Sequence, residues 1–332
     1  MVSVVICTYN RDSAFEDTVR GFLEIRSAEV DHELLLMDNN SSDGTREIGV
    51  RFASRYPWIR YVNEARQGHP HSKNRAVRES RGEIVAFVDD DVYFSPGWLK
   101  AIASCFARRP DVSCVGGRVV PHFEVDRPSW VEEDMLWIYG VTRYGERERE
   151  IEPPEIPIGC NMAFRREVFE QIGYFHAALG RKPGILLSGD EDHFLHRLAR
   201  AGLKTLYSPE AQVSHRVPAA RASRDWVVER FYWAGISEVA MRQLGDEPFS
   251  RYVLSKRAYW AMRSILRQWR DAPCLLGGRN GENGKVPVAR QAYLYHRLGT
   301  LRQLIAEAFA AGAGKARDGQ GTDHGGWRPI PR

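Results

Sequence analysis

Short runs of apolar, mostly β-branched residues alternate along the first part of the chain with segments whose apolar residues recur at helical spacing. The runs predict strands at 2–7, 33–38, 59–62, 84–88 and 112–120. The segments between them predict helices near 13–26, 43–55, 72–80 and 96–108. Strands that alternate with helices of about 10 to 15 residues are typical of successive βαβ units, so the sequence predicts an α/β fold around a mostly parallel sheet.

This alternation ends near residue 120. Residues 121–157 are rich in Pro, Trp and Glu and predict a loop-rich lobe, and a further strand and helix follow over 157–172. A helix after Gly189 and a short strand pair ending near His215 complete the predicted body. Beyond residue 224 the sequence predicts helices, with a Gly-rich interruption at 277–281. These changes divide the chain into four predicted segments, 1–120, 121–220, 221–310 and a mobile tail at 311–332.

Composition is that of an ordinary globular protein, with 43% apolar and 27% charged residues among 332. No apolar run approaches the roughly 18 to 20 residues that a membrane-spanning helix needs. Residues 1–5 lack the basic region and cleavage site of a signal peptide, and the five cysteines form no C-x-x-C pair. We therefore expect a reduced, cytoplasmic protein without a disulfide framework.

Charge is distributed unevenly along the chain. Up to His215 there are 27 lysines and arginines against 33 carboxylates, a net charge of −6. From Arg216 onward there are 20 against 10, a net charge of +10. A basic C-terminal third is typical of a segment that faces an anionic partner such as lipid headgroups, nucleic acid or a phosphorylated substrate.

Carboxylates follow one of the buried strands. Asp89, Asp90 and Asp91 come directly after the apolar run 84–88, and parallel sheets bind their ligands at the carboxyl ends of strands. Adjacent carboxylates repel one another unless a cation neutralises them, and a hard divalent ion shared with substrate phosphates is the usual solution. The alternative is a solvated acidic turn before the helix that begins near Pro96.

Two further polar segments could carry chemistry. Asp38 and Asn39 stand at another strand exit, where their oxygens could accept hydrogen bonds from a nucleobase, although the residues after them also suit a turn and a helix N-cap. Asp190, Glu191 and Asp192 open a predicted helix, where the helix dipole stabilises carboxylates. A carboxylate there could equally be a general base toward an incoming hydroxyl. His215, alone at the end of a short strand, is more often structural than a metal ligand.

Several common motifs are absent from the sequence. It contains no G-x-x-x-x-G-K-[ST] phosphate loop, no G-x-G-x-x-G, no G-x-S-x-G and no paired Cys/His zinc spacing.

Taken together, the polar segments resemble those of the family 2 glycosyltransferases, which are inverting enzymes with the GT-A fold. The matching pieces fall in the family's order and cover the chain up to about residue 215. They are 4–11, 38–45, 73–76, 81–84, 89–91, 159–166 and 191–192. The resemblance implies a Rossmann-like, mostly parallel mixed sheet flanked by helices, here followed by a C-terminal helical extension.

The resemblance also implies the reaction. A sugar would move, with inversion, from a nucleotide-diphosphate donor, UDP first among the nucleotides, to a hydroxyl of a glycan or lipid-linked acceptor, as in polysaccharide biosynthesis. A divalent metal, Mn²⁺ or Mg²⁺, would neutralise the leaving diphosphate. Residues 1–120 would bind the donor, and residues 121–220 would hold the acceptor and the catalytic base.

Roles for single residues follow from the same resemblance. Asp91 would bind the metal directly, Asp89 the ribose or a metal-bound water, and His215, 23 residues after Asp192, would complete the metal shell. Asp192 would be the base, with Glu191 as the less favoured choice. The other residues expected to bind the donor are Thr8, Asn10, Asp38, Asn39, Lys73, Asp90, Gly159, Cys160 and Asn161.

Two positions depart from the family pattern. The residue after Asp38, often a second Asp, is Asn39, which leaves the base preference open. The usual Ala-Arg-Asn is Ser72-Lys73-Asn74 here, so Lys73 is expected to contact a phosphate.

Two other classes of protein compete with this interpretation. A nucleotidyltransferase that makes nucleotide sugars also uses carboxylates and Mg²⁺, but it would need a Gly-rich basic loop where this chain has residues 8–12. A non-catalytic protein that binds sugars or nucleotides has no need of a base such as Glu191 or Asp192.

The basic C-terminal third contains one strongly patterned stretch. Its apolar stripe at helical spacing is Tyr259, Met262, Leu266 and Trp269. The cations beside it are Lys256, Arg257, Arg263, Arg267 and Arg270. Such a helix can lie in a membrane interface, or it can pack its stripe on the catalytic body. The charge favours reversible, peripheral contact with the inner face of the cell membrane through residues 250–310, and no nucleic acid is expected as partner.

Overall fold

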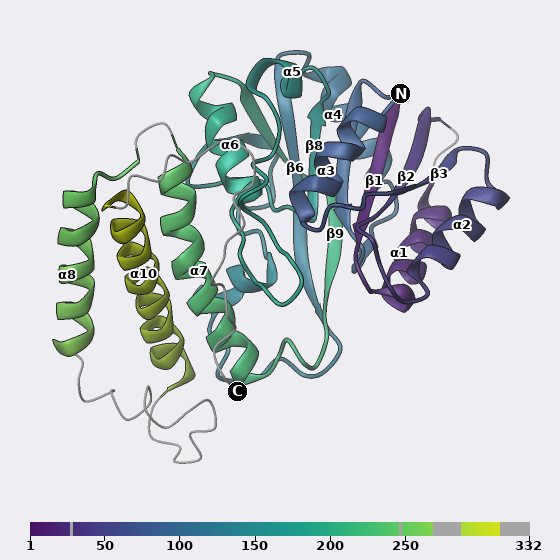
Figure 1. The fold of residues 1–332 in the computed structure, drawn as a ribbon. Coiled ribbons are helices and arrows are strands. Elements are labelled where there is room, and N and C mark those ends of the chain that lie inside the picture. Colours follow the sequence, from purple (N-terminus) through teal and green to yellow (C-terminus); the bar gives the residue numbers. More distant parts are fainter. Residues whose placement is uncertain (27–28, 246–247, 268–286, 313–332) are drawn as a thin grey trace. The chain divides into compact units, whose positions relative to one another are not determined.

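The computed structural model describes residues 1–26, 29–245, 248–267 and 287–312. Its contacts divide the chain into two compact units (Figure 1). The sheet unit consists of Met1–Glu124, Tyr139–His176 and Glu191–Val217. The helical unit consists of Val125–Ile138, Ala177–Asp190 and the described residues from Pro218 onward.

Among the described residues, the sheet unit contains one mixed sheet of nine strands. They are β1 (Val2–Thr8), β2 (His32–Asp38), β3 (Ile59–Asn63), β4 (Ile84–Asp89), β5 (Val92–Phe94), β6 (Val112–Phe123), β7 (Arg149–Ile151), β8 (Asn161–Arg165) and β9 (Lys204–Val217). The strand order is β3-β2-β1-β4-β8-β6-β9-β5, and β7 pairs with β9. Strands β3, β2, β1 and β4 run parallel, whereas β8 is antiparallel to both β4 and β6.

Helices cover both faces of this sheet (Figure 1). They are α1 (Asp12–Ile25), α2 (Thr45–Arg55), α3 (His69–Glu79), α4 (Trp98–Arg108), α5 (Val168–Ile172) and α6 (Asp190–Arg200). All seven residues of β1 are buried, and successive side chains alternate between two cores. Val4 and Ile6 belong to the core that contains residues of α1 and α4, and Val5 belongs to the core that contains residues of α3 and α6. A strand buried on both faces explains the continuous apolar run in the sequence.

The structure confirms the predicted α/β fold with a mostly parallel sheet flanked by helices. It differs from the expectation in two ways. The predicted boundary at residue 120 falls inside β6, so the segments 1–120 and 121–220 share one sheet. Residues 204–217 form a single long strand and not a strand pair, because β9 pairs along its length with β6.

The helical unit contains η1 (Glu133–Tyr139, shared with the sheet unit at its last residue), α7 (Arg224–Leu244), α8 (Arg251–Arg267) and α10 (Val288–Gly312). Helix α10 packs on both α7 and α8 and lies between them (Figure 1). A Cβ on Gly235 of α7 would overlap the carbonyl oxygen of His296, and a Cβ on Gly299 of α10 would overlap that of Tyr232. The two backbones therefore touch.

The predicted C-terminal helices are present in this unit. The interruption at 277–281, the side chains of Trp269 and Arg270, and residues 313–332 of the predicted tail lie outside the described residues. None of the described helices is long and apolar enough to cross a membrane.

Candidate active site

The parallel register brings the predicted strand exits to one edge of the sheet. Thr8 at the end of β1 is paired with Asp38 at the end of β2, and Cys7 is paired with Asp89 at the end of β4. Asp38 and Asp89 therefore lie on either side of β1, at the edge where such sheets bind ligands.

Asp89, Asp91 and His215 form a cluster at this edge. The short strand β5, which follows the Asp triplet, pairs with β9 so that Val92 is opposite His215. One ligand atom from each of the three residues lies within 4.8 Å of the others, and His215 Nε2 is 3.2 Å from Asp91 Oδ1. Two carboxylates and an imidazole at this separation match the donor set of a divalent metal site.

The hydrogen bonding of His215 fixes its tautomer. Its Nδ1 lies 2.7 Å from the carbonyl oxygen of Tyr139, and a carbonyl can only accept, so Nδ1 carries the hydrogen. In the neutral ring Nε2 then presents its lone pair on the side of Asp91. Metal-binding histidines are oriented in the same way, through a hydrogen bond from the nitrogen that does not bind the ion.

A cation from the end of β1 completes the surroundings of the triplet. Arg11 Nη1 is 3.0 Å from Asp91 Oδ2, the carboxylate oxygen that does not face His215. Burial alone would lower the pKa of Arg11, but Asp90 and Asp91 raise it. Burial also raises the pKa of Asp89, and it raises the pKa of Asp90 to about 7 against the opposing effect of Arg11. Burial thus disfavours the charged forms of Asp89 and Asp90, and Arg11 offsets this only in part for Asp90.

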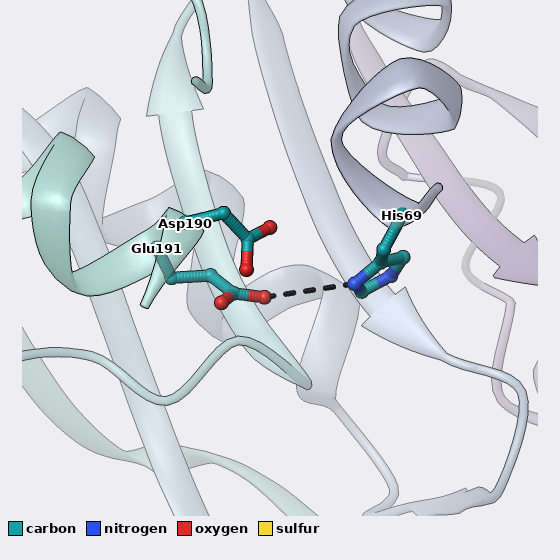
Figure 2. Close-up of side chains that lie close together, drawn as sticks. All are labelled: His69, Asp190 and Glu191. Atoms are coloured by element: carbon teal, nitrogen blue, oxygen red, sulfur yellow. Dashed lines mark ion pairs between the residues drawn. The ribbon is translucent and has the colours of Figure 1, made fainter. Parts of the chain in front are cut away.

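The two candidate bases at the start of α6 differ in their surroundings. Lys73 of α3, which is 1% exposed, forms an ion pair with Glu191, and His69 Nδ1 lies 3.8 Å from Glu191 Oε1 (Figure 2). Asp192 follows in the chain and is half-buried. Because Glu191 faces a buried ammonium group, its carboxylate is held in place by a full charge.

Gly159 lies directly against Glu191. A Cβ at position 159 would be 2.5 Å from Glu191 Oε1, so any larger residue there would require the Glu191 carboxylate to shift. Three predicted site residues, Lys73, Gly159 and Glu191, are therefore brought together by the fold. They come from α3, from the segment before β8 and from α6.

Asp38 and Asn39 hold the loops at the end of β2. Asp38 accepts hydrogen bonds from Tyr61 Oη at 2.6 Å and from the backbone N–H of Ser41 at 2.9 Å. Asn39 uses its Nδ2 to donate to two carbonyl oxygens and its Oδ1 to accept from a backbone N–H. The partners are the carbonyls of Glu64 and Arg66 and the N–H of Gly68, at 3.2, 2.7 and 2.8 Å. These bonds shape residues 64–68 beside the predicted nucleobase position.

Asn10 plays a similar part at the end of β1. It adopts a left-handed backbone with φ of +50°, and its Oδ1 accepts from the N–H of Ser42 at 2.8 Å. Its own N–H donates to Ser41 Oγ at 2.9 Å. The loops after β1 and β2 are thereby joined next to Thr8, which is buried.

The side chains of Cys160 and Asn161 are buried. Asn161 is fully buried; its Nδ2 donates to the carbonyls of Arg118 and Ala211, and its Oδ1 accepts from Trp98 Nε1 at 2.9 Å. Cys160 is 2% exposed, and burial raises the pKa of its thiol. A buried amide must satisfy both its N–H groups and its oxygen. Here β6 and β9 supply the accepting carbonyls and α4 supplies the donating N–H. The amide of Asn161 thus has a structural role, and the expected contact of these two residues with the donor sugar stays a prediction.

Three residues of the site were not expected from the sequence. Arg11 stands one residue after Asn10, and a cation at a strand exit opposite three carboxylates was a usable signal. His69, at the start of α3, stands apart from other candidate ligands in the sequence, and such a histidine is usually structural. Tyr139 contributes only its backbone carbonyl to His215, and no sequence signal reports such a contact.

The family model described as glycosyl transferase family 2 matches residues 3–173 of this chain. Among curated proteins, the glucosyl-dolichyl phosphate glucuronosyltransferase of Haloferax volcanii is 28% identical over 243 residues, which cover 72% of this chain and 77% of that protein. The succinoglycan biosynthesis protein ExoM of Rhizobium meliloti is 26% identical over 243 residues, covering 70% and 72%.

Solved structures show the same fold. The mannosyltransferase PcManGT from Pyrobaculum calidifontis, in complex with GDP-Man and Mn²⁺, superposes with a TM-score of 0.57 at 23% identity, covering 95% of this chain and 88% of that one. TarS of S. aureus in complex with UDP-GlcNAc superposes with a TM-score of 0.52 at 14% identity, covering 96% and 93%. The predicted GT-A fold is thereby confirmed.

Proposed function

The chain belongs to glycosyl transferase family 2, and we propose that it catalyses metal-dependent, inverting transfer from a nucleotide-diphosphate sugar to a hydroxyl of a glycan or lipid-linked acceptor. Glycosyl transfer from a nucleotide-sugar donor follows from the family and from the activities named for its relatives. The metal, the inversion, the acceptor and the roles of single residues are the proposal.

Asp89, Asp91 and His215 would hold the divalent metal, Mn²⁺ or Mg²⁺. The observation that carries this assignment is that one ligand atom of each residue lies within 4.8 Å of the others, with His215 Nδ1 held by the Tyr139 carbonyl and Nε2 facing Asp91 at 3.2 Å. When bound, such an ion neutralises the diphosphate and makes it a good leaving group. The complexes of PcManGT and of GalNAc-T7 contain Mn²⁺, which supports a metal of this class.

Asp192 would be the base. Its carboxylate would take the proton of the acceptor hydroxyl while that oxygen attacks the anomeric carbon. The bond from the anomeric carbon to the diphosphate breaks on the opposite side, and its electron pair leaves with the nucleoside diphosphate, so the configuration inverts. Glu191 is less suited to this step because its carboxylate is paired with the ammonium of Lys73.

Lys73 would act through Glu191. Its side chain is 1% exposed and forms an ion pair with Glu191 in the first turn of α6. By holding that turn, the ion pair would help to position the neighbouring Asp192. Thr8, Asn10, Asp38 and Asn39 would shape the nucleobase position through the loops that they hold together.

The donor and the acceptor are proposed more broadly. UDP is the first nucleotide to test, although PcManGT binds GDP-Man and TarS binds UDP-GlcNAc. The relative from Haloferax volcanii is named for glucosyl-dolichyl phosphate, which supports a lipid-linked acceptor. We place the enzyme in the cytoplasm, with peripheral contact to the inner face of the membrane.

Turnover of Asp192→Asn and Glu191→Gln tests the assignment of the base. Asp192→Asn keeps the shape but cannot take the proton, so kcat should fall about 100-fold or more while nucleotide affinity stays near the parental value. Glu191→Gln should keep more activity and should lose stability, because Lys73 loses its partner. Near-parental turnover in Asp192→Asn together with an inactive Glu191→Gln would move the role to Glu191.

A panel of nucleotides finds the donor. Thermal unfolding with UDP, GDP, dTDP and CMP, each with and without Mn²⁺, should single out one nucleotide whose stabilisation depends on the metal, because a ligand that binds only the folded state raises its stability. Equal shifts with and without Mn²⁺ for every nucleotide would contradict the metal-dependent mechanism.

A further inference from the structure

Helix α8 has one side packed and one side exposed. Leu254 and Ala258 are buried in a cluster with Val239 of α7 and Leu304 of α10, so this side faces the other helices of the unit (Figure 1). The side chains on the opposite side remain in water. A helix that served only to pack on its neighbours would bury the stripe formed by Tyr259, Met262 and Leu266, yet these three side chains are 50%, 44% and 63% exposed.

An exposed row runs along the other side of α8. The row, called the docking face below, consists of Tyr252, Lys256, Tyr259, Arg263 and Leu266. Spacings of four, three, four and three residues place its members on one stripe of the helix. Tyr252 is 74% exposed, and Trp260 beside the row is 51% exposed. Large aromatic and aliphatic side chains this far out of the core mark a surface that meets a partner.

The charge of α8 has a single sign. The helix contains five cations and no carboxylate over its 17 residues. They are Arg251, Lys256, Arg257, Arg263 and Arg267. Arg263 lies 5.5 Å from the ring centre of Trp260, and its Nη1 is 3.4 Å from Tyr259 Oη, so cation and rings form one exposed group. The partner of this face must therefore offer negative charge together with an apolar layer.

We propose that α8 docks the protein on an anionic lipid surface, with its axis parallel to the membrane and the docking face turned toward the lipid. Tyr and Trp rings suit the headgroup boundary, Leu266 and Met262 reach the acyl region, and Lys256 and Arg263 extend to the phosphates. A helix of 17 residues would lie along about 25 Å of the interface. The helix is bound peripherally and does not cross the bilayer.

Other partners fit the docking face less well. In a dimer related by a two-fold axis the face would meet itself, and cations with no carboxylate between them would repel. Nucleic acid would satisfy the cations but would leave Leu266 and Met262 against a polar backbone. An anionic membrane satisfies both kinds of side chain.

The purpose of this docking, access to a lipid-linked acceptor, rests on the proposed function. Vesicle binding itself is measured without turnover and does not depend on it. The full-length protein is co-sedimented with vesicles of phosphatidylcholine alone and with vesicles containing about one third phosphatidylglycerol. We expect binding to the anionic vesicles at about 0.05 M salt and a marked loss at about 0.5 M. If binding fails while nucleotide binding and turnover are intact, the docking inference is wrong and the enzyme assignment stands.

Two paired variants separate charge from apolar contact. Lys256→Glu with Arg263→Glu should lower the partition to anionic vesicles roughly 100-fold or more, because each cation near such a surface contributes about five-fold. Tyr259→Ala with Leu266→Ala should lower it about ten-fold and should leave the salt dependence in place. All four side chains are exposed, so the fold should persist, and thermal unfolding checks this. Should the reversed pair unfold, Lys256→Gln with Arg263→Gln repeats the test.

A matched charge reversal on the sheet unit is the control. Arg55→Glu with Arg147→Glu changes the net charge by the same amount at two exposed positions and should keep vesicle binding. An equal loss of vesicle binding in the control pair would show that binding depends only on the net charge of the protein, and it would overturn the assignment to α8. So would absence of binding to anionic vesicles, equal binding to neutral ones, or a dimer in solution that the α8 reversal abolishes.

Discussion

The two oxygens of Asp91 have different partners. Oδ1 faces His215 Nε2 at 3.2 Å, and Oδ2 faces Arg11 Nη1 at 3.0 Å. The carboxylate is therefore oriented from both sides, and its Oδ1 is turned toward the position that Asp89 and His215 share. The candidate metal site therefore depends on the orientation of its side chains as well as on which residue types are present.

Removing the Asp91 carboxylate should remove the metal dependence of nucleotide binding. Asp91→Ala is expected to bind nucleotide with the same affinity with and without Mn²⁺, because two of the three donors cannot hold the ion against water. Calorimetric titration with and without Mn²⁺ measures this. Asp126→Ala, at an exposed carboxylate that is not part of the cluster, should behave as the parent, and an unchanged metal dependence in Asp91→Ala would contradict the site.

Arg11 should compete electrostatically with the ion. A guanidinium next to the triplet already supplies part of the positive charge that the carboxylates need, and a divalent ion would meet its repulsion at short range. Arg11→Met should therefore bind Mn²⁺ about ten-fold more tightly and be less stable without it. Arg11→Lys should resemble the parent. Weaker Mn²⁺ binding in Arg11→Met, measured by the loss of free Mn²⁺ signal in electron paramagnetic resonance, would contradict this view.

Helices α3 and α6 are joined by the ion pair of Lys73 and Glu191. Lys73→Met leaves a half-buried carboxylate without its cation and should lower the free energy of unfolding by about 3 kcal/mol. Lys73→Met combined with Glu191→Leu removes both charges and should recover most of that loss. Urea unfolding of the parent, both single variants and the double variant gives the coupling between the two positions. Additive losses would show that the pair contributes no coupling.

The loop between β3 and α3 should make stability depend on acid pH. A hydrogen bond from Arg66 lowers the pKa of Glu64 to about 2, so the folded state favours the ionised carboxylate. This contribution is present above the ordinary value of 4.5 and is lost as the pH falls toward 2. With allowance for solvent around the exposed Arg66, Glu64→Gln should cost about 1 to 2 kcal/mol at pH 7. The difference from the parent should vanish near pH 2, and a difference independent of pH would contradict the pairing.

At the scale of elements the sequence predicted most of the sheet unit. The strands β1, β2 and β4 show as continuous apolar runs because they are buried on both faces, and the helices up to residue 120 show apolar residues at helical spacing because one face of each is buried. The strands β5 and β7 have three residues each, too few for a period to show. Asn39 and Asn161 are both expected at the donor site from the sequence. Their side chains donate hydrogen bonds to backbone carbonyls that are far away along the chain, and such contacts form only in the folded protein.

The charge division of the whole molecule agrees with the two units. The net −6 lies in a stretch that is mostly sheet unit, and the net +10 lies in a stretch that is helical where it is described. Composition alone thus indicated two parts, although it placed the boundary only roughly. The segments 125–138 and 177–190 also belong to the helical unit, although they lie apart from its C-terminal segment in the sequence. Charge counts do not reveal this.

The two units should respond separately to a change at the crossing of α7 and α10. Gly299→Ala puts a Cβ against the Tyr232 carbonyl and should destabilise the helical unit by about 1 to 3 kcal/mol. Affinity for Mn²⁺ and nucleotide in the sheet unit should be unchanged. Gly21→Ala is the matched control, since the nearest atom to its Cβ is 3.9 Å away, and it should gain up to about 1 kcal/mol of helix stability. Circular dichroism during thermal unfolding measures both, and a neutral Gly299→Ala would contradict the close contact.

The backbone contact between α7 and α10 also limits which substitutions this sequence can accept during evolution. Where two side chains meet, a change in one can be answered by a change in the other, and the ion pair of Lys73 and Glu191 could be exchanged for two apolar residues in that way. At Gly235 and Gly299 the opposing atoms are carbonyl oxygens, which every amino acid carries, so no second substitution can restore the space. In a library randomised at positions 235 and 299, the variants that still fold should keep glycine at each. In a library randomised at positions 73 and 191, the variants that still fold should carry either a charged pair or an apolar pair.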